Sequence, residues 1–350
     1  MDFVVKRDDL RQCRFVDAPS PQLEPGQALL EVDSFALTSN NVTYAVMGDA
    51  MSYWSLFPAL DGWGRVPVWG FADVAASTHD ALAEGTRVYG YLPPSTHLVV
   101  TPDPADERGF VDSAPHRANM ADVYNSYVRV DADPGYDPRR EDQQMLLRPL
   151  FGTAFLLDAH LAEKDFFGAG TVVVSSASSK TALGTAFLLA RRSGLEVIGL
   201  TSAERVGFVE GVGVYDGVVP YADVASLPHD TAVYVDISGD AGVRATVHEH
   251  YGEALAHSLI VGVTHWDRRD AGPDPLPGPQ PSLFFAPDVI ERHGGLDGGA
   301  AEAVRAAVDW SAGWLQVVHG NGPEAVERVY RELLDGAIDP SVGHVLSLRS

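Results

Sequence analysis

The segment 171–201 constrains the fold of this chain more than any other stretch. Residues 171–174 (TVVV) form a short apolar, β-branched run, which is typical of a strand buried on both faces. A polar turn follows, and residues 182–192 then carry small or apolar side chains nearly all round, as in a buried helix that stops at Gly194. A second apolar run covers residues 196–200. Strand, turn, helix and strand within about thirty residues form a βαβ unit. We therefore expect a doubly wound parallel sheet that binds nucleotides at the first such turn.

This turn differs from the usual dinucleotide loop. A G-x-G-x-x-G fingerprint works because glycine lets the backbone approach a pyrophosphate, and here only Gly184 occupies a matching place. A Walker A loop is excluded, because the glycine directly before Lys180 and the one five residues earlier are both absent. Hydroxyls and an ammonium can instead hydrogen-bond a phosphate directly. The residues expected to do so are Ser176, Ser178, Ser179, Lys180 and Thr181. The alternative is a capped helix in an α/β domain without redox function.

The overall composition limits the classes of partner. The chain has 350 residues, which is enough for two domains with ample cores. Its formal net charge of −23 argues against binding to nucleic acid or to an anionic membrane. No apolar run approaches the ~18–20 residues of a transmembrane helix, and the first residues lack an apolar secretion segment. The only cysteine, Cys13, excludes an intramolecular disulfide and fits a reducing compartment, so we expect a cytoplasmic protein.

Two segments around the βαβ unit carry a resemblance to a known family. Residues 148–154 (RPLFGTA) include the pair Thr153 and Ala154, and residues 194–205 read GLEVIGLTSAER. They resemble the medium-chain dehydrogenase/reductase superfamily, in its zinc-independent quinone and enoyl reductase branch. The Thr-Ala pair is similar to one that precedes the first cofactor strand there, and the serine- and lysine-rich loop resembles an uncharacterised subfamily. The match extends more weakly over most of the chain.

The resemblance implies an α/β fold with two domains. A GroES-like, β-rich substrate domain would comprise residues 1–135 and 325–350, and a Rossmann-type dinucleotide-binding domain residues 136–324. Near the C-terminus we expect helices at residues 302–318 and 324–334. Relatives in this superfamily often pair as dimers, so the analogy also predicts a homodimer.

Candidate catalytic and substrate-binding residues come from the expected substrate domain. Residues 38–48 resemble the N-P-x-x-x-Y-x-x-x-G segment of quinone and enoyl reductases, with Tyr44 at the tyrosine. A tyrosine there can donate its hydroxyl proton to a substrate oxygen; the alternative is that Tyr44 packs at a domain edge. Among the aromatic residues of 51–70, Tyr53, Trp54 and Trp63 are expected to line an apolar pocket, with Trp54 exposed. A local cluster that holds down a loop is the other interpretation.

Further candidates lie at predicted strand ends and in a loop. Ser238 ends a segment that resembles the superfamily strand beside the cofactor ribose, and Phe285 lies in one that resembles the nicotinamide-side turn, although an expected arginine is missing. His265 ends a predicted strand, where ligand-contacting groups belong, and is either a proton donor or an exposed histidine. His116 and Arg117 either contact an anionic substrate group or fix their loop.

The end of the second strand indicates which nicotinamide cofactor binds. NAD-selective sites place an acid there, whereas NADP-selective sites use small hydroxyl residues with a nearby cation. Thr201, Ser202 and Arg205 fit the NADP(H) pattern, and Glu204 would oppose a phosphate unless it points outward.

Zinc is not expected. Zinc alcohol dehydrogenases of this superfamily use cysteine ligands, which one cysteine cannot supply. His248 and His250 lie two residues apart, would point to different helix faces and are interpreted as surface histidines.

The sequence thus predicts a zinc-free NADPH-dependent oxidoreductase. It would reduce an activated C=C or C=O bond of an apolar small molecule at the interdomain cleft. The alternative is a non-redox lyase, isomerase or binding protein on a medium-chain reductase scaffold that has lost dinucleotide use.

Overall fold

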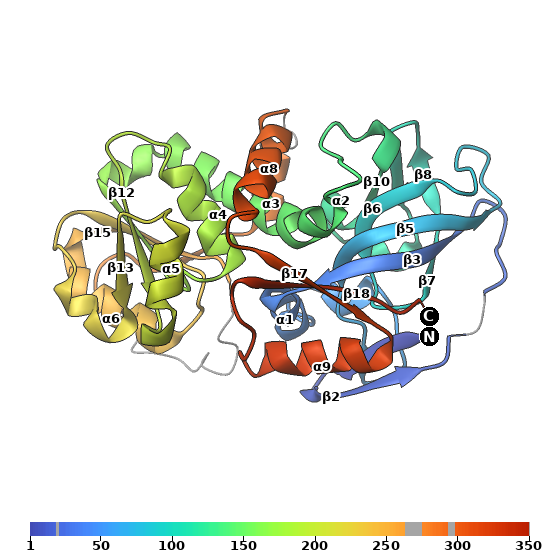
Figure 1. Ribbon diagram of the computed structural model, residues 1–350, viewed down its shortest axis with the longest axis horizontal. Coiled ribbons are helices and arrows are strands. Elements are labelled where there is room, and N and C mark those ends of the chain that lie inside the picture. Colours follow the sequence, from blue (N-terminus) through green and yellow to red (C-terminus); the bar gives the residue numbers. More distant parts are fainter. Residues whose placement is uncertain (19–20, 263–274, 293–297, 350) are drawn as a thin grey trace. The chain divides into compact units, whose positions relative to one another are not determined.

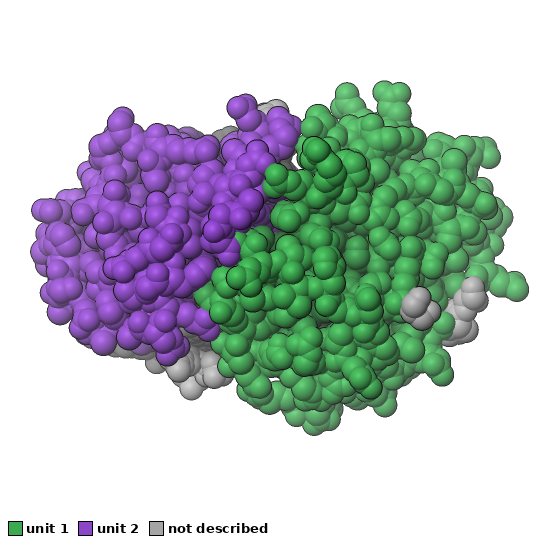
Figure 2. All heavy atoms as spheres, viewed as in Figure 1, with its two compact units in different colours: residues 1–146, 315–350 green, residues 147–314 purple. Residues whose placement is uncertain are grey.

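The computed structural model describes residues 1–18, 21–262, 275–292 and 298–349. The chain forms two compact units, of which unit 1 comprises residues 1–146 and 315–350 and unit 2 comprises residues 147–314 (Figure 2). The predicted domain boundaries lie about ten residues from these divisions. Each unit is described by itself.

Unit 2 is built around a parallel sheet, of which β12, β13 and β15 are labelled in Figure 1. Within the described residues its strand order is β13-β12-β11-β14-β15-β16, and every neighbouring pair is parallel. Numbered within the unit, this is the order 3-2-1-4-5-6 of a dinucleotide-binding fold. The strands are β11 (Thr171–Val174), β12 (Glu196–Thr201), β13 (Gly217–Pro220), β14 (Ala232–Asp236), β15 (Leu255–Ile260) and β16 (Ser282–Leu283). The helices are α3 (Glu141–Glu163), which begins in unit 1, α4 (Lys180–Leu189), α5 (Val206–Val212), α6 (Ala241–Tyr251), α7 (Ala286–Arg292) and α8 (Gly298–Ser311), with 3-10 turns η4 (Asp165–Gly168), η5 (Ala203–Arg205), η6 (Tyr221–Ser226) and η7 (Gly252–Ala254).

The central strand β11 is buried on both faces, as its sequence predicts. Val172 and Val174 pack into one apolar cluster with residues of α3 and α4, while Val173 packs into a second cluster with residues of α6. Full burial of each valine contributes about 1.5–3 kcal/mol. The two clusters cover both faces of the sheet.

Gly184 of α4 serves helix packing. A Cβ atom at this position would lie 2.9 Å from the Phe151 ring and 3.3 Å from Cβ of Ala154, both on α3. The glycine that matches the dinucleotide fingerprint therefore lets α4 approach α3 closely.

Helix α3 is long and apolar, and of the described helices it is the one with the length and composition to cross a membrane. The sequence analysis did not identify it because Arg148 and Asp158 interrupt the apolar run. Half of its apolar stretch is buried inside the protein, as in the core helices of globular proteins.

Unit 1 is rich in antiparallel strands. Its larger sheet has the order β17-β18-β3-β5-β6-β10-β9-β8, with β7 also paired to β3, and most of these strands are labelled in Figure 1. A small sheet has the order β2-β1-β4. The strands are β1 (Asp2–Lys6), β2 (Asp9–Val16), β3 (Ala28–Leu37), β4 (Trp63–Gly64), β5 (Val68–Ser77), β6 (Arg87–Leu92), β7 (His97–Val100), β8 (Pro102–Ala105), β9 (Gly109–Asp112), β10 (Ser126–Arg129), β17 (Gln316–Asn321) and β18 (Val342–Ser347). The helices are α1 (Ser39–Val46), α2 (Asp122–Asn125) and α9 (Pro323–Leu334), with 3-10 turns η1 (Tyr53–Ser55), η2 (Pro115–Arg117) and η3 (Val130–Ala132).

The prediction of a helix through residue 318 is wrong. Helix α8 ends at Ser311, and Gln316–Asn321 form strand β17, which pairs in parallel with β18. Both Val317 and Val318 lie in this strand, and β-branched side chains favour extended backbone where a partner strand is present. The following helix, α9, begins at Pro323 and ends at Leu334, as predicted.

Candidate functional site

The loop after β11 lies at the switch point of the unit 2 sheet. Strands β11 and β14 are neighbours, while β12 continues the sheet on one side and β15 on the other. A crevice for a ligand forms outside the carboxyl ends of the strands where the order reverses in this way. Residues 175–179 leave β11 there and lead directly into α4.

The N-terminus of α4 offers backbone donors to this crevice. Ser179 is the N-cap, and its hydroxyl accepts a hydrogen bond from the Ala182 amide at 3.3 Å. The amides of Ser178 and Thr181 have no acceptor among the described residues. Free amides at a helix N-terminus, together with the positive end of the helix dipole, favour an anion. Lys180, the first residue of α4, is half-buried.

Two tyrosines that the sequence analysis missed support this loop. Ser176 adopts a left-handed conformation (φ 53°), and its amide donates to the Tyr221 hydroxyl at 2.9 Å. The Tyr215 hydroxyl donates to the Ala177 carbonyl at 3.2 Å. A Cβ at Gly199 would lie 2.8 Å from Ala177 and 3.1 Å from the Tyr215 ring, so this glycine provides room for both. Tyr221 directly follows β13, and the rule that ligand groups follow parallel strands could have identified it.

The end of β12 carries the predicted ribose-binding residues. Thr201 is buried, and Ser202 and Arg205 are half-buried. The Ala177 amide donates to the Leu200 carbonyl at 3.0 Å, which joins the loop to this strand end. The Ser202 hydroxyl donates to the exposed Glu204 carboxylate at 3.3 Å. Glu204 therefore lies against one of the hydroxyls that NADP(H) selection would use, rather than pointing away from it.

Three other predicted cofactor residues have different surroundings. Ser238 is fully buried, and its hydroxyl donates to Asp236 at 2.7 Å. The Thr153 hydroxyl donates to the Pro149 carbonyl within α3, at 3.3 Å. Phe285 is half-buried just before α7. The structure thus gives the Ser238 and Thr153 hydroxyls partners within the protein, and their role at a cofactor stays a prediction.

The predicted catalytic residues are Tyr44 and His265, and His265 lies outside the described residues. Tyr44 is 8% exposed, and its hydroxyl accepts a hydrogen bond from the Trp69 indole at 3.3 Å. Burial raises the pKa of the Tyr44 hydroxyl above its ordinary value. Its ring lies 5.0 Å from that of Tyr53 and 5.4 Å from that of Tyr91. Tyr44 therefore belongs to an aromatic cluster in the core of unit 1, and it stays protonated at neutral pH.

The three residues predicted for the substrate pocket do not share one environment. Tyr53 belongs to the aromatic cluster. Trp63 lies on β4, with the Arg14 guanidinium 4.1 Å from its ring centroid. The expectation that Trp54 is exposed is wrong, because it is 3% exposed and fills space beside Gly48 and Gly64, where a Cβ would overlap its ring. Their assignment to one pocket stays a prediction.

Arg117 and His248 are both buried, and this burial decides how each was to be interpreted. Arg117 is fully buried and pairs with the buried Asp112 at 3.1 Å, so it fixes its loop instead of facing a ligand. The interpretation of His248 as a surface residue is wrong. It is fully buried, with its ring nitrogens 2.8 Å from the Pro277 carbonyl and 3.0 Å from the Ser258 hydroxyl. Burial lowers the pKa of His248, which favours the neutral ring.

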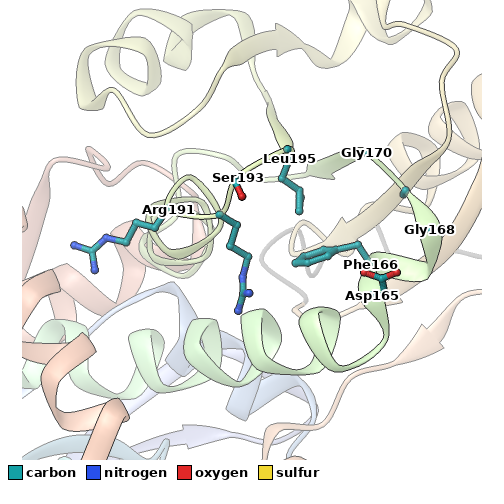
Figure 3. A pocket seen from close by; sticks show the side chains of 10 residues that line it. Asp165, Phe166, Gly168, Gly170, Arg191, Ser193 and Leu195 are labelled. Atoms are coloured by element: carbon teal, nitrogen blue, oxygen red, sulfur yellow. The ribbon is translucent and has the colours of Figure 1, made fainter.

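A pocket of about 620 Å³ lies at the end of the same sheet that is opposite the candidate cofactor loop (Figure 3). Gly170 and Leu195 line it, and these residues directly precede β11 and β12, so the pocket is at the amino ends of the strands. Arg192 also lines it but binds Asp158 through two hydrogen bonds of 2.6 and 2.7 Å. Because nucleotides bind at the carboxyl ends of such strands, this pocket is separate from the candidate cofactor loop.

Comparison with known proteins gives the same fold. CurA from Vibrio vulnificus, solved in complex with NADPH, has a TM-score of 0.63 at 16% identity, covering 97% of this chain and 94% of that one. The quinone oxidoreductase from Coxiella burnetii has a TM-score of 0.58 at 12% identity, covering 99% of both chains. The yhdH oxidoreductase from Salmonella enterica, in complex with NADP, has a TM-score of 0.54 at 13% identity, again covering 99% of both. These likenesses confirm the predicted fold class, a GroES-like β-rich domain with a Rossmann domain.

Sequence comparison identifies the family. A search of curated proteins finds no match to this chain. A family profile described as "Protein of unknown function (DUF2855)" matches residues 35–339, which is most of the chain. The chain therefore belongs to the DUF2855 family.

Proposed function

We propose that this protein is a zinc-free, NADPH-dependent reductase of an activated C=C or C=O bond in an apolar small molecule. The observation that carries the proposal is the loop after β11. It lies at the switch point of a 3-2-1-4-5-6 sheet and presents the Ser178 and Thr181 amides at the N-terminus of α4. These donors, with Lys180, have the chemistry to hold the pyrophosphate of a dinucleotide.

The solved structures of similar fold support this assignment. CurA and the yhdH oxidoreductase were solved with NADPH and NADP, respectively. In this chain, Thr201, Ser202 and Arg205 at the end of β12 would face the 2′-phosphate. A nicotinamide supplies a hydride when bound. The Tyr44 hydroxyl is protonated at neutral pH, as tyrosine ordinarily is, and would be the proton donor to a substrate oxygen on which charge develops.

Dinucleotide binding tests the proposal without knowledge of the substrate. NADPH titrated into the protein should enhance nicotinamide fluorescence. At a hundredfold excess over Kd it should also raise the free energy of unfolding by ~2–3 kcal/mol. NADH, tested in parallel, should bind more weakly. If neither nucleotide changes fluorescence or stability, the protein is a non-redox member of the fold.

The substrate class requires a second experiment. A panel of enones, quinones and aldehydes should be screened for NADPH oxidation, with Tyr44→Phe as the matched variant. We expect one class to be turned over, and Tyr44→Phe to lower kcat while the Kd for NADPH stays unchanged. Equal kcat values for the two proteins would remove Tyr44 from the mechanism.

A further inference from the structure

The loops at the carboxyl ends of the sheet are joined by a buried polar network that the sequence analysis did not identify. Ser175 directly follows β11, and Asp236 is the last residue of β14. Both are fully buried. The Ser175 hydroxyl donates to the Asp236 carboxylate at 2.8 Å and accepts from the amides of Ile237 and Ser238, each at 3.0 Å. A hydroxyl has one donor and two acceptor positions, so all its hydrogen-bonding capacity is used between these two loops.

Asp236 extends the network to further elements. The oxygen that accepts from Ser175 also accepts from the Ser238 hydroxyl at 2.7 Å and from the Gly239 amide at 3.0 Å. Its other carboxylate oxygen accepts from Arg244 of α6 at 2.9 Å. The Asp236 carbonyl accepts from the Val261 amide at 2.8 Å, just after β15. One buried residue thus connects the chain segments that follow β11, β14 and β15 with helix α6.

The position of this network matters for the crevice beside it. Ser175 is next to Ser176, whose left-handed backbone is sterically costly for a residue with a side chain. A loop with glycines tolerates such conformations, whereas this loop needs neighbours that hold it in place. Ser175 holds it from the β14 side, and the Tyr221 hydroxyl holds it through the Ser176 amide from the β13 side. The Ser179 amide donates to the Ser176 carbonyl at 2.7 Å, so the backbone that carries the Ser178 and Thr181 amides is joined to this segment.

We propose that Ser175, Asp236 and Arg244 are positioning residues, which hold the glycine-poor loop in the conformation that binds the dinucleotide. They act through the backbone and do not contact the cofactor. This inference rests on the proposed function, and it explains how a loop without the usual glycines retains an ordered phosphate-binding backbone. A preorganised loop binds more tightly because less conformational entropy is lost when the ligand binds.

The test compares variants within unit 2. Ser175→Ala removes the shared hydroxyl, and Arg244→Met removes the partner of Asp236. Asp158→Asn is the matched control, because Asp158 is a mostly buried carboxylate paired with Arg192 away from the carboxyl ends of the strands. The measurements are the Kd for NADPH by fluorescence, the free energy of unfolding in urea, and hydrogen exchange of the backbone amides of residues 175–182 and 237–239.

We expect Ser175→Ala and Arg244→Met to weaken NADPH binding by about tenfold, and Asp158→Asn to lower stability while leaving Kd within about twofold. A purely structural network would lower stability in all three variants and leave Kd unchanged, which would overturn the proposal. If the unmodified protein binds neither NADPH nor NADH, the proposed function fails and exchange alone decides. Faster exchange of these amides in Ser175→Ala than in Asp158→Asn would then show that the network orders the loop, although not for a dinucleotide, and equal exchange would overturn the ordering as well.

Discussion

Single residues at the end of β12 carry opposing charges. Arg205 favours a 2′-phosphate, but the Ser202 hydroxyl donates to the Glu204 carboxylate, which repels one. Glu204→Gln should therefore strengthen NADPH binding by about fivefold, which corresponds to ~1 kcal/mol for an exposed charge contact, and leave NADH binding nearly unchanged. The Kd values for both nucleotides, measured by fluorescence titration, check this.

The matched control for this prediction is Glu210→Gln, which removes the same charge from an exposed position on α5. It should change neither Kd. Arg205→Ala should act in the opposite direction and weaken NADPH much more than NADH. If Glu204→Gln and Glu210→Gln had equal effects, the contribution of Glu204 would be only its share of the total charge.

An ion network connects three strands of unit 1 with the start of α3. Arg87 of β6 pairs with Asp33 of β3 at 2.7 Å, with Asp73 of β5 at 3.0 Å and with Glu141 of α3 at 2.8 Å. The Arg87 side chain is 22% exposed. Arg349 also pairs with Asp33 at 3.0 Å and with Asp73 at 3.3 Å. Removal of Arg87 would therefore leave one cation for these two carboxylates and take the Arg87 pair from Glu141, which is costly where such groups are shielded from water.

Arg87→Met is expected to lower the free energy of unfolding by about 2 kcal/mol, less than the roughly 3–5 kcal/mol for a fully buried pair because the site is partly hydrated. Urea unfolding measures this change. Arg139→Met is the control, since Arg139 is 87% exposed and its pair with Asp137 should contribute little. Similar losses in the two variants would show that the network adds no stability beyond a surface pair.

The aromatic cluster of unit 1 gives a pH dependence. Burial raises the pKa values of Tyr44, Tyr53, Tyr91 and Tyr124 above the ordinary value of 10.0. Each hydroxyl then keeps its proton in the folded state at a pH where the unfolded chain has lost it. This contribution to stability is complete below pH 10 and decreases as the pH rises towards the folded-state values.

We therefore expect the free energy of unfolding to fall steeply above about pH 10, with these tyrosines ionising only as the protein unfolds. Tyrosinate absorbance and far-ultraviolet circular dichroism, recorded together along an alkaline titration, test this. Tyrosinate formation by all the tyrosines before any loss of helix signal would contradict it.

Helices and strands whose own residues show a clear apolar pattern could be predicted from the sequence. A strand that depends on pairing with a distant segment could not. The run TVVV at Thr171–Val174 is strand β11, and the helix expected at residues 324–334 is α9 (Pro323–Leu334). Residues 316–318, the first half of β17, fall within the predicted helix 302–318, because the partner strand β18 begins about twenty-five residues further along the chain. The alternation of its own residues is too short to show that pairing.

Contacts between distant parts of the chain also limited the prediction of the candidate site. The loop residues 176–181 could be identified because they are contiguous. Tyr221 contacts this loop from 45 residues away, and Asp236 contacts Ser175 from 61 residues away. These contacts follow from the order of strands β13, β11 and β14, which the sequence does not specify residue by residue. The fold was therefore more predictable than the groups that shape its site.

The net charge of −23 predicts how salt changes the stability of the whole protein. Acidic side chains outnumber basic ones by 48 to 25, so the folded state is destabilised by self-repulsion, which salt screens. Salt also weakens individual ion pairs, but exposed pairs contribute only about 0–1 kcal/mol each. Raising NaCl from about 0.01 M to about 0.15 M shortens the Debye length from ~30 Å to ~8 Å and should raise Tm. KCl should have the same effect and sucrose at equal osmolality a smaller one, whereas a Tm that falls with NaCl would mean that ion pairs such as those of Arg87 outweigh the repulsion.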